Sequence, residues 1–262
     1  MAAIPPSDAG RPGYLSNLGV ALHHRFERIG DLADLDKAIT AEREAVAAIP
    51  PSDPDRPICL SNLGNVLRDR FERTGQQADL DEAITARRDA VTATPPDNPN
   101  RPRHLSNLGL TLLTRFERVD HQADLYEAIN AFTDVLAAAP PDHPNRPLWL
   151  SNLGFALWTR FRRTGQQADL DETITAFMDA VEVESGPPAV RMRAGRVWGS
   201  VAIDAGWVDS AADGFASAVG WLPLLPGTGC RELPGRNTWP ASAVWPRTPR
   251  RVRSEPGARS ER

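Results

Sequence analysis

A five-residue word, Leu-Ser-Asn-Leu-Gly, recurs at a fixed period and constrains the fold of this 262-residue chain more than any other feature. Its four copies begin at Leu15, Leu60, Leu105 and Leu150, so successive copies lie 45 residues apart. An identical word at one period of this length is typical of a repeat array, in which each unit buries its apolar face on its neighbours. We therefore expect an elongated stack of similar units without a single central core.

Each unit has the pattern of two consecutive helices. In the first, Leu15, Leu18, Leu22 and Phe26 share one face of a helix with 3.6 residues per turn. Asp or Asn followed by Arg-Pro precedes this stripe in units two to four, and proline is tolerated in a first turn because the N–H groups there have no helical partner. In chain order, the expected stop residues of the first helices are Gly30, Gly75, Asp120 and Gly165.

The second helix of each unit is expected to open at an aspartate, in chain order Asp34, Asp79, Asp124 and Asp169. In the last three units a glutamate follows three places later, which is a capping-box pattern with Asp in place of Ser or Thr. A Pro-Pro pair, as at Pro50, ends the helix. Glycine inside a helix costs roughly 1 kcal/mol relative to alanine. We therefore expect Gly19 and its equivalents to let the second helix approach closely through small residues such as Ala38.

The motifs of the unit resemble a known repeat. Leu18-Gly19, Ala38, Ala45 and Pro50 are similar to the Leu-Gly, Ala, Ala and Pro positions of the tetratricopeptide repeat, with about seven extra residues between the helices. The resemblance implies an all-α fold, a right-handed superhelix of helical hairpins with about ten helices.

A fifth unit follows at the unextended spacing of that family, with Gly199, Ala211, Phe215, Ala218 and Pro223 at its characteristic positions. The long units, together with residues 191–194 and 221–225, also resemble the repeat region that precedes caspase-like CHAT protease domains in bacterial, especially actinobacterial, proteins. This resemblance covers residues 2–225, and the protease domain itself is absent from the sequence.

The expected organisation has three parts. Residues 1–11 resemble the remnant of a preceding repeat and linker, and residues 12–225 form the repeat domain with units 12–55, 56–100, 101–145, 146–186 and 187–225. Residues 226–262 are rich in Pro, Gly, Arg and Ser and are expected to form a disordered basic tail, since eight Arg and three Glu lie beyond residue 222. A frameshift near residues 225–227 would explain the change of composition and remains a hypothesis.

Enzymatic patterns are missing from the sequence. Cys59 and Cys230 match no redox or metal spacing, and the five histidines have no spacing such as His-Glu-x-x-His, so we expect neither catalysis nor a metal nor another cofactor. No apolar run is long enough to span a membrane. The N-terminus lacks a basic segment and an apolar core. We therefore expect a cytoplasmic protein without a membrane partner, and we do not expect nucleic acid to be its partner.

The repeated asparagines carry the sharper functional hypothesis. An Asn directly before Leu-Gly resembles the Asn ladder with which kinesin-light-chain-like repeats grip an extended peptide, and an amide side chain can pair with any peptide unit. The alternative is that the asparagines bond neighbouring helices or recur through duplication. The four residues are Asn17, Asn62, Asn107 and Asn152.

Other groove positions of the resembled family vary between units. Ser16, Val20, His23 and His24 in the first unit are followed by Ser61, Asn65, Arg68 and Asp69, then by Ser106, Leu110, Leu113 and Thr114, and finally by Ser151, Phe155, Trp158 and Thr159. The side chains at these positions change from polar in unit two to apolar in units three and four. An exposed Phe155–Trp158 pair would suit an anchor pocket for an apolar side chain, and packing against the next unit is the alternative.

The sequence therefore favours a non-catalytic scaffold whose concave groove binds a protein or an extended peptide. Two alternatives stay open. The chain could be the regulatory half of a CHAT-type protease system, with a CHAT-type protease domain as its partner, or it could be a gene remnant.

Overall fold

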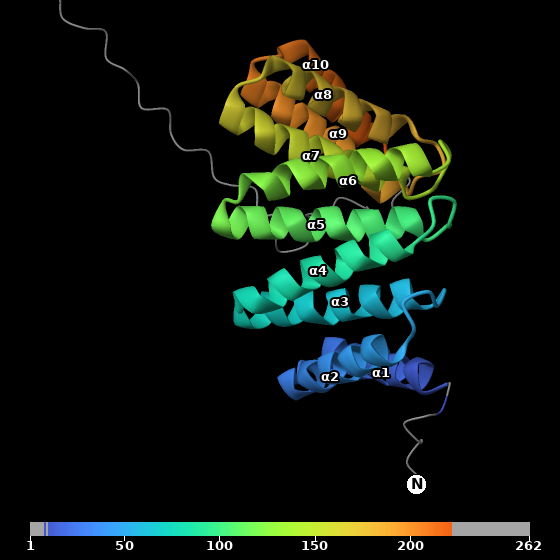
Figure 1. Ribbon diagram of the computed structural model, residues 1–262. Helices are drawn as coiled ribbons and strands as arrows, with labels where there is room; N and C mark the ends of the chain where they lie inside the picture. Colours follow the sequence, from blue (N-terminus) through green and yellow to red (C-terminus); the bar gives the residue numbers. More distant parts are fainter. Residues whose placement is uncertain (1–7, 9, 222–262) are drawn as a thin grey trace, which may run out of the picture.

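The computed structural model describes residue 8 and residues 10–221, and within this part of the chain every regular element is a helix. The ten helices stack as successive hairpins in one elongated body (Figure 1). In chain order they are α1 (Arg11–Ile29), α2 (Leu32–Ala48), α3 (Arg56–Thr74), α4 (Gln77–Ala93), α5 (Arg101–Val119), α6 (Gln122–Ala138), α7 (Arg146–Thr164), α8 (Gln167–Glu182), α9 (Pro188–Ala205) and α10 (Val208–Gly220). The tail expected at 226–262 and the remnant up to residue 7 lie outside the described residues.

The stop signals of the first helices are confirmed. Gly30, Gly75 and Gly165 end α1, α3 and α7 with φ of 80°, 70° and 69°. Asp120 ends α5 with φ of 58°, and among the described residues it is the one non-glycine with positive φ. Aspartate tolerates this left-handed conformation better than most residues, since its short side chain can hydrogen-bond locally.

The predicted start of the second helices is wrong by two residues. These helices begin at Leu32 and at Gln77, Gln122 and Gln167, and only α2 has a side-chain cap, in which the Asp31 carboxylate accepts a hydrogen bond from the N–H of Ala33. Asp79 and its equivalents lie inside the first turn. The capping box therefore does not form.

Those first-turn aspartates instead hold the two helices of each hairpin together. Arg70 on α3 donates two hydrogen bonds to the Asp79 carboxylate, at 2.8 and 2.6 Å, and the Asp79 side chain is only 4% exposed. A planar guanidinium matches a carboxylate in this two-bond geometry. The same pair recurs in every long unit as Arg25–Asp34, Arg70–Asp79, Arg115–Asp124 and Arg160–Asp169.

The repeat glycine meets a different residue from the one expected. A Cβ on Gly109 would lie 2.7 Å from the ring of Phe132, and one on Gly154 would lie 3.0 Å from Phe177. The side chain that packs on the glycine therefore belongs to the second helix and lies four residues, about one helical turn, after the small residue at the position of Ala38. In the first two units this position is charged, because Glu42 covers Gly19 and Arg87 covers Gly64.

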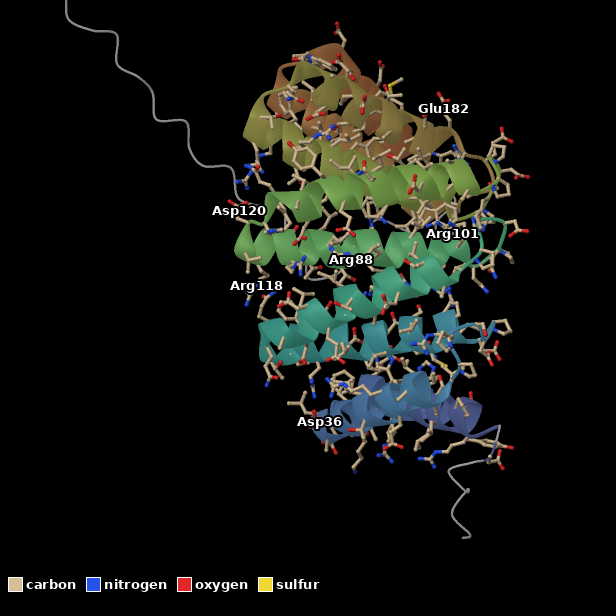
Figure 2. The ribbon with its side chains drawn as sticks, in the orientation of Figure 1. Asp36, Arg88, Arg101, Arg118, Asp120 and Glu182 are labelled. Carbon is tan, nitrogen blue, oxygen red and sulfur yellow. The ribbon has the colours of Figure 1, made fainter. Side chains whose placement is uncertain are left out.

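Neighbouring units are joined by a linker arginine and by surface ion pairs. Arg101, labelled in Figure 2, donates to the carbonyl oxygens of Val91 and Thr94 at the end of α4, so it satisfies groups that a helix C-terminus leaves unpaired. On the second helices, Arg88 pairs with Glu127 and connects α4 to α6. These contacts fix how each hairpin sits on the next.

The fifth hairpin, α9 and α10, is shorter and packs backbone to backbone. A Cβ on Gly195 would lie 2.9 Å from the carbonyl oxygen of Gly214, and Gly199 meets the ring of Phe215. Gly206 ends α9 with φ of 82°. Within the described ranges, none of these helices combines the length and apolar character needed to cross a membrane.

Candidate binding surface on the first helices

The first helices of the units form a layer in which most neighbours contact one another directly. α1 contacts α3, α5 contacts α7, and α7 contacts α9, whereas each second helix packs mainly on its own partner and on the first helix of the next unit. The second helices of successive units are instead bridged by long side chains, as in Arg43–Glu82 and Arg88–Glu127. Since the first helices approach one another more closely than the second helices do, we infer that their layer lies on the concave side. We call this layer the inner face.

The four repeated asparagines are not equivalent on the inner face. Asn17 is exposed, and Asn62 and Asn107 are half-buried. The Nδ2 of Asn62 donates to Ser16 Oγ of the previous unit at 3.2 Å, so this residue also joins α1 to α3. Asn152 is 2% exposed, and its Nδ2 has no partner among the described residues. Only Asn17, Asn62 and Asn107 can reach a partner without rearrangement.

The serines that precede these asparagines are buried, which corrects their assignment to the groove. Ser61 and Ser106 are 3% and 6% exposed. Ser151 donates its hydroxyl to the carbonyl oxygen of Pro147 at 2.7 Å, and Ser16 donates to Glu42. The Ser16 hydroxyl thus joins α1 to α2, whereas the Ser151 hydroxyl bonds within α7, and the sequence could not distinguish either contact from a groove role.

The expectation of an exposed aromatic pair is wrong. Trp158 is 6% exposed, belongs to the same apolar cluster as Trp198 of the fifth hairpin, and stacks on Phe161 with ring centroids 5.4 Å apart. Phe155 is half-buried and packs on the cluster around Leu112. The alternative considered from the sequence, packing against the next unit, describes Trp158.

Within the second hairpin, between α3 and α4, a charged side chain is enclosed. Arg87 is 1% exposed, and its Nη2 donates to Asn65 Oδ1 at 3.0 Å and to the carbonyl oxygen of Gly64 at 3.3 Å. Its Nε and Nη1 have no partner among the described residues. Burial lowers the pKa of Arg87 to about 9, with a smaller contribution from the charge of Arg68. Asn65, a predicted groove residue, thus accepts a hydrogen bond from Arg87 on the other helix of its hairpin.

The first hairpin encloses an acidic side chain. Glu42 is fully buried and accepts the Ser16 hydroxyl at 3.0 Å. Burial raises the pKa of Glu42 to about 8, although the hydrogen bond from Ser16 acts in the other direction. At neutral pH this carboxyl is therefore mostly protonated, and the core between α1 and α2 contains a neutral polar group.

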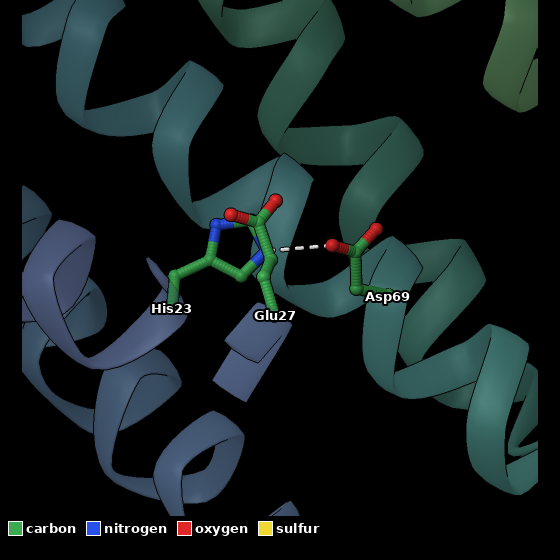
Figure 3. Close-up of side chains that lie close together, drawn as sticks. All are labelled: His23, Glu27 and Asp69. Atoms are coloured by element: carbon green, nitrogen blue, oxygen red, sulfur yellow. Dashed lines mark hydrogen bonds and ion pairs between the residues drawn. The ribbon is translucent and has the colours of Figure 1, made fainter. Parts of the chain in front are cut away.

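A polar cluster crosses from α1 to α3. His23 Nε2 lies 2.6 Å from Asp69 Oδ2 (Figure 3). Arg68 donates to Asp69 Oδ1 at 3.0 Å. Burial raises the pKa of Asp69, but the hydrogen bond from His23 and the charge of Arg68 outweigh burial, so the pKa lies below its ordinary value. Sequence reasoning placed these residues at groove positions but did not pair them, because they belong to different units.

Comparison with known proteins agrees with the architecture. Residues 58–99, which contain α4 and most of α3, match the tetratricopeptide repeat family. The crystal structure of MamA is similar over 82% of this chain and 94% of MamA, with a TM-score of 0.57 at 18% identity. The fold is that of a tetratricopeptide-repeat solenoid.

Two further solved structures resemble this tetratricopeptide-repeat solenoid. MamA from Desulfovibrio magneticus RS-1 covers 81% of this chain and 97% of its own at 18% identity, with a TM-score of 0.54. A putative kinesin light chain with TPR-like repeats from Podosopora anserina covers 80% and 95% at 14% identity, with a TM-score of 0.58. At these identities the likeness concerns the fold, and the all-α, TPR-like prediction is confirmed. No curated protein matches the chain.

Proposed function

We propose that this chain is a non-catalytic scaffold that binds a protein or an extended peptide along its inner face. Tetratricopeptide-type solenoids typically act as scaffolds for protein interactions, and the fold supports this class for the present chain. The observation that carries the proposal is the row of accessible amides on the inner face, Asn17, Asn62 and Asn107, at a period of one unit.

The amide of Asn107 is the best place to test this row. It is half-buried, it lies in the centre of the array, and its side chain makes no hydrogen bond to another described residue. A peptide unit in the groove could pair with both its carbonyl and its amino group. Since one hydrogen bond contributes about 0.5–1.5 kcal/mol, Asn107→Ala should weaken partner binding by roughly 2- to 12-fold.

The experiment is affinity capture from the source cell, followed by calorimetric titration of the captured partner into the wild-type chain and the variant. We expect weaker binding by Asn107→Ala at an unchanged thermal midpoint. Asn152→Ala, whose side chain is enclosed, is the matched control and should change stability rather than affinity at the groove. Equal affinity of the Asn107 variant and the wild type would refute a role of the row in binding.

A more specific hypothesis concerns the partner. The sequence resemblance to repeats that precede CHAT protease domains suggests that such a domain is the partner and that any proteolysis is carried out by it. The source gene and its neighbours provide the test: a CHAT-type domain encoded there should bind the chain when the two are expressed together, and failure to associate would remove it as a partner.

A further inference from the structure

Three potential metal ligands from two different units meet on the inner face near the end of α1. His23 and Glu27 lie four residues apart on α1, and Asp69 lies on α3. One ligand atom from each of the three lies within 4.8 Å of the others, and Figure 3 shows the three side chains converging. We call these residues the α1–α3 cluster.

We propose that the α1–α3 cluster binds a divalent transition-metal ion, with Zn²⁺ the best match, through His23 Nε2 and one carboxylate oxygen each from Asp69 and Glu27. An imidazole and carboxylates are ordinary ligands of zinc, and a site with three protein ligands keeps its fourth tetrahedral position for water. The carboxylate pair also neutralises the charge of the ion.

The distances in the cluster fit such an ion after a small adjustment. Zinc bonds of about 2.0–2.2 Å in a tetrahedron place ligand atoms roughly 3.3–3.6 Å apart. His23 Nε2 and Asp69 Oδ2, now 2.6 Å apart, must therefore separate by less than about 1 Å. The Glu27 side chain is 52% exposed, so it has room to turn Oε1 toward the other two while Oε2 stays near His24.

Neighbouring groups hold the second oxygen of each carboxylate. Arg68 donates to Asp69 Oδ1 at 3.0 Å and leaves Oδ2 facing His23. His24 Nδ1 lies 2.9 Å from Glu27 Oε2 and leaves Oε1 available. Outer groups of this kind orient the ligands of metal sites. The positive charge of Arg68 repels the ion, but the two negative charges of the carboxylates outweigh this single positive charge.

Among the four long units, a histidine at the position of His23 faces an aspartate at the position of Asp69 only at the junction of units one and two. Arg68, Leu113 and Trp158 replace the histidine in units two to four, and Thr114 and Thr159 replace the aspartate in units three and four. A bound ion would thus tie α1 to α3 and stiffen the first junction alone.

The test is calorimetric titration of ZnCl₂ into the full-length chain, with the thermal midpoint measured with zinc and with a chelator. We expect one ion per chain and a midpoint that rises with zinc. His23→Arg is the matched variant, because unit two carries Arg68 at this position and an arginine can keep the contact with Asp69. It should fold normally yet bind zinc at least tenfold more weakly. Asp69→Asn should do the same.

His121→Ala is the control, since it removes an exposed histidine on another unit and should leave zinc binding unchanged. Zinc binding that survives both His23→Arg and Asp69→Asn would place the ion elsewhere and overturn the proposal. The absence of any zinc-dependent heat or midpoint shift in the wild-type chain would do so as well. The titration needs no partner, so its outcome is independent of the scaffold function.

Discussion

The buried carboxyl of Glu42 makes the stability of the first two hairpins dependent on pH, and Glu42→Gln isolates the effect. The side chain is fully buried, and its only hydrogen-bond partner among the described residues is Ser16. Glutamine has nearly the same shape, keeps an oxygen for the Ser16 hydroxyl and cannot ionise. The variant therefore removes the titration while preserving the packing.

The sign follows from the two pKa values. In the unfolded chain Glu42 loses its proton near pH 4.5, and in the folded chain burial raises the pKa to about 8. Between these values the folded state binds one more proton than the unfolded state, so the free energy of unfolding falls as pH rises, by at most about 1.4 kcal/mol per pH unit. Below pH 4.5 the contribution is fully present, and above pH 8 it has been lost.

The magnitude is large for one side chain. A shift of this size corresponds to an upper limit on the order of 5 kcal/mol at pH 8, and relaxation of the structure would reduce it to about 2–4 kcal/mol. We expect wild type and Glu42→Gln to be equally stable near pH 4.5. The variant should become progressively more stable than wild type up to pH 8.

Urea unfolding followed by circular dichroism across this pH range measures the difference. Local opening of α1–α3 should be followed by hydrogen exchange as well, because solenoids can unfold unit by unit. Glu44→Gln, on the same helix but with a side chain 50% exposed, is the control and should change stability by less than about 0.5 kcal/mol at every pH. Parallel stability curves for wild type and Glu42→Gln would refute the reasoning.

Two further substitutions test the packing of the repeat. Asp79→Ala should lower the free energy of unfolding by about 3 kcal/mol, since it removes the buried carboxylate that Arg70 binds and leaves Arg70 only its contact with the exposed Asp36. Glu82→Ala, in an ion pair on the exposed surface, should lower it by less than about 1 kcal/mol. Chemical denaturation compares the two variants, and equal losses would contradict the assignment. Gly109→Ala should lower the thermal midpoint by an amount equivalent to about 1–2 kcal/mol, because the new methyl group would meet Phe132, while Gly13→Ala, with nothing within 4 Å, should leave it unchanged or raise it.

The sequence by itself determined the number and type of elements. The fixed period set the unit, the apolar stripe set the helices, and Gly30, Gly75 and Gly165 set the helix ends, because each of these depends on residues close together in the chain. At Asp79 the local sequence suggested the wrong role. An aspartate at this position suits both a helix cap and an ion pair with Arg70, nine residues earlier, and the sequence alone does not distinguish the two.

Only the tertiary structure decided which side chains face one another. Stacking buried Trp158 against the fifth hairpin and brought His23 of the first unit to Asp69 of the second. These contacts depend on the rotation and shift of one hairpin on the next, to which many weak contacts contribute jointly and which no short segment encodes. The period of the chain fixes what each unit is, and the angle between units fixes which of its polar groups remain available to a partner or to a metal ion.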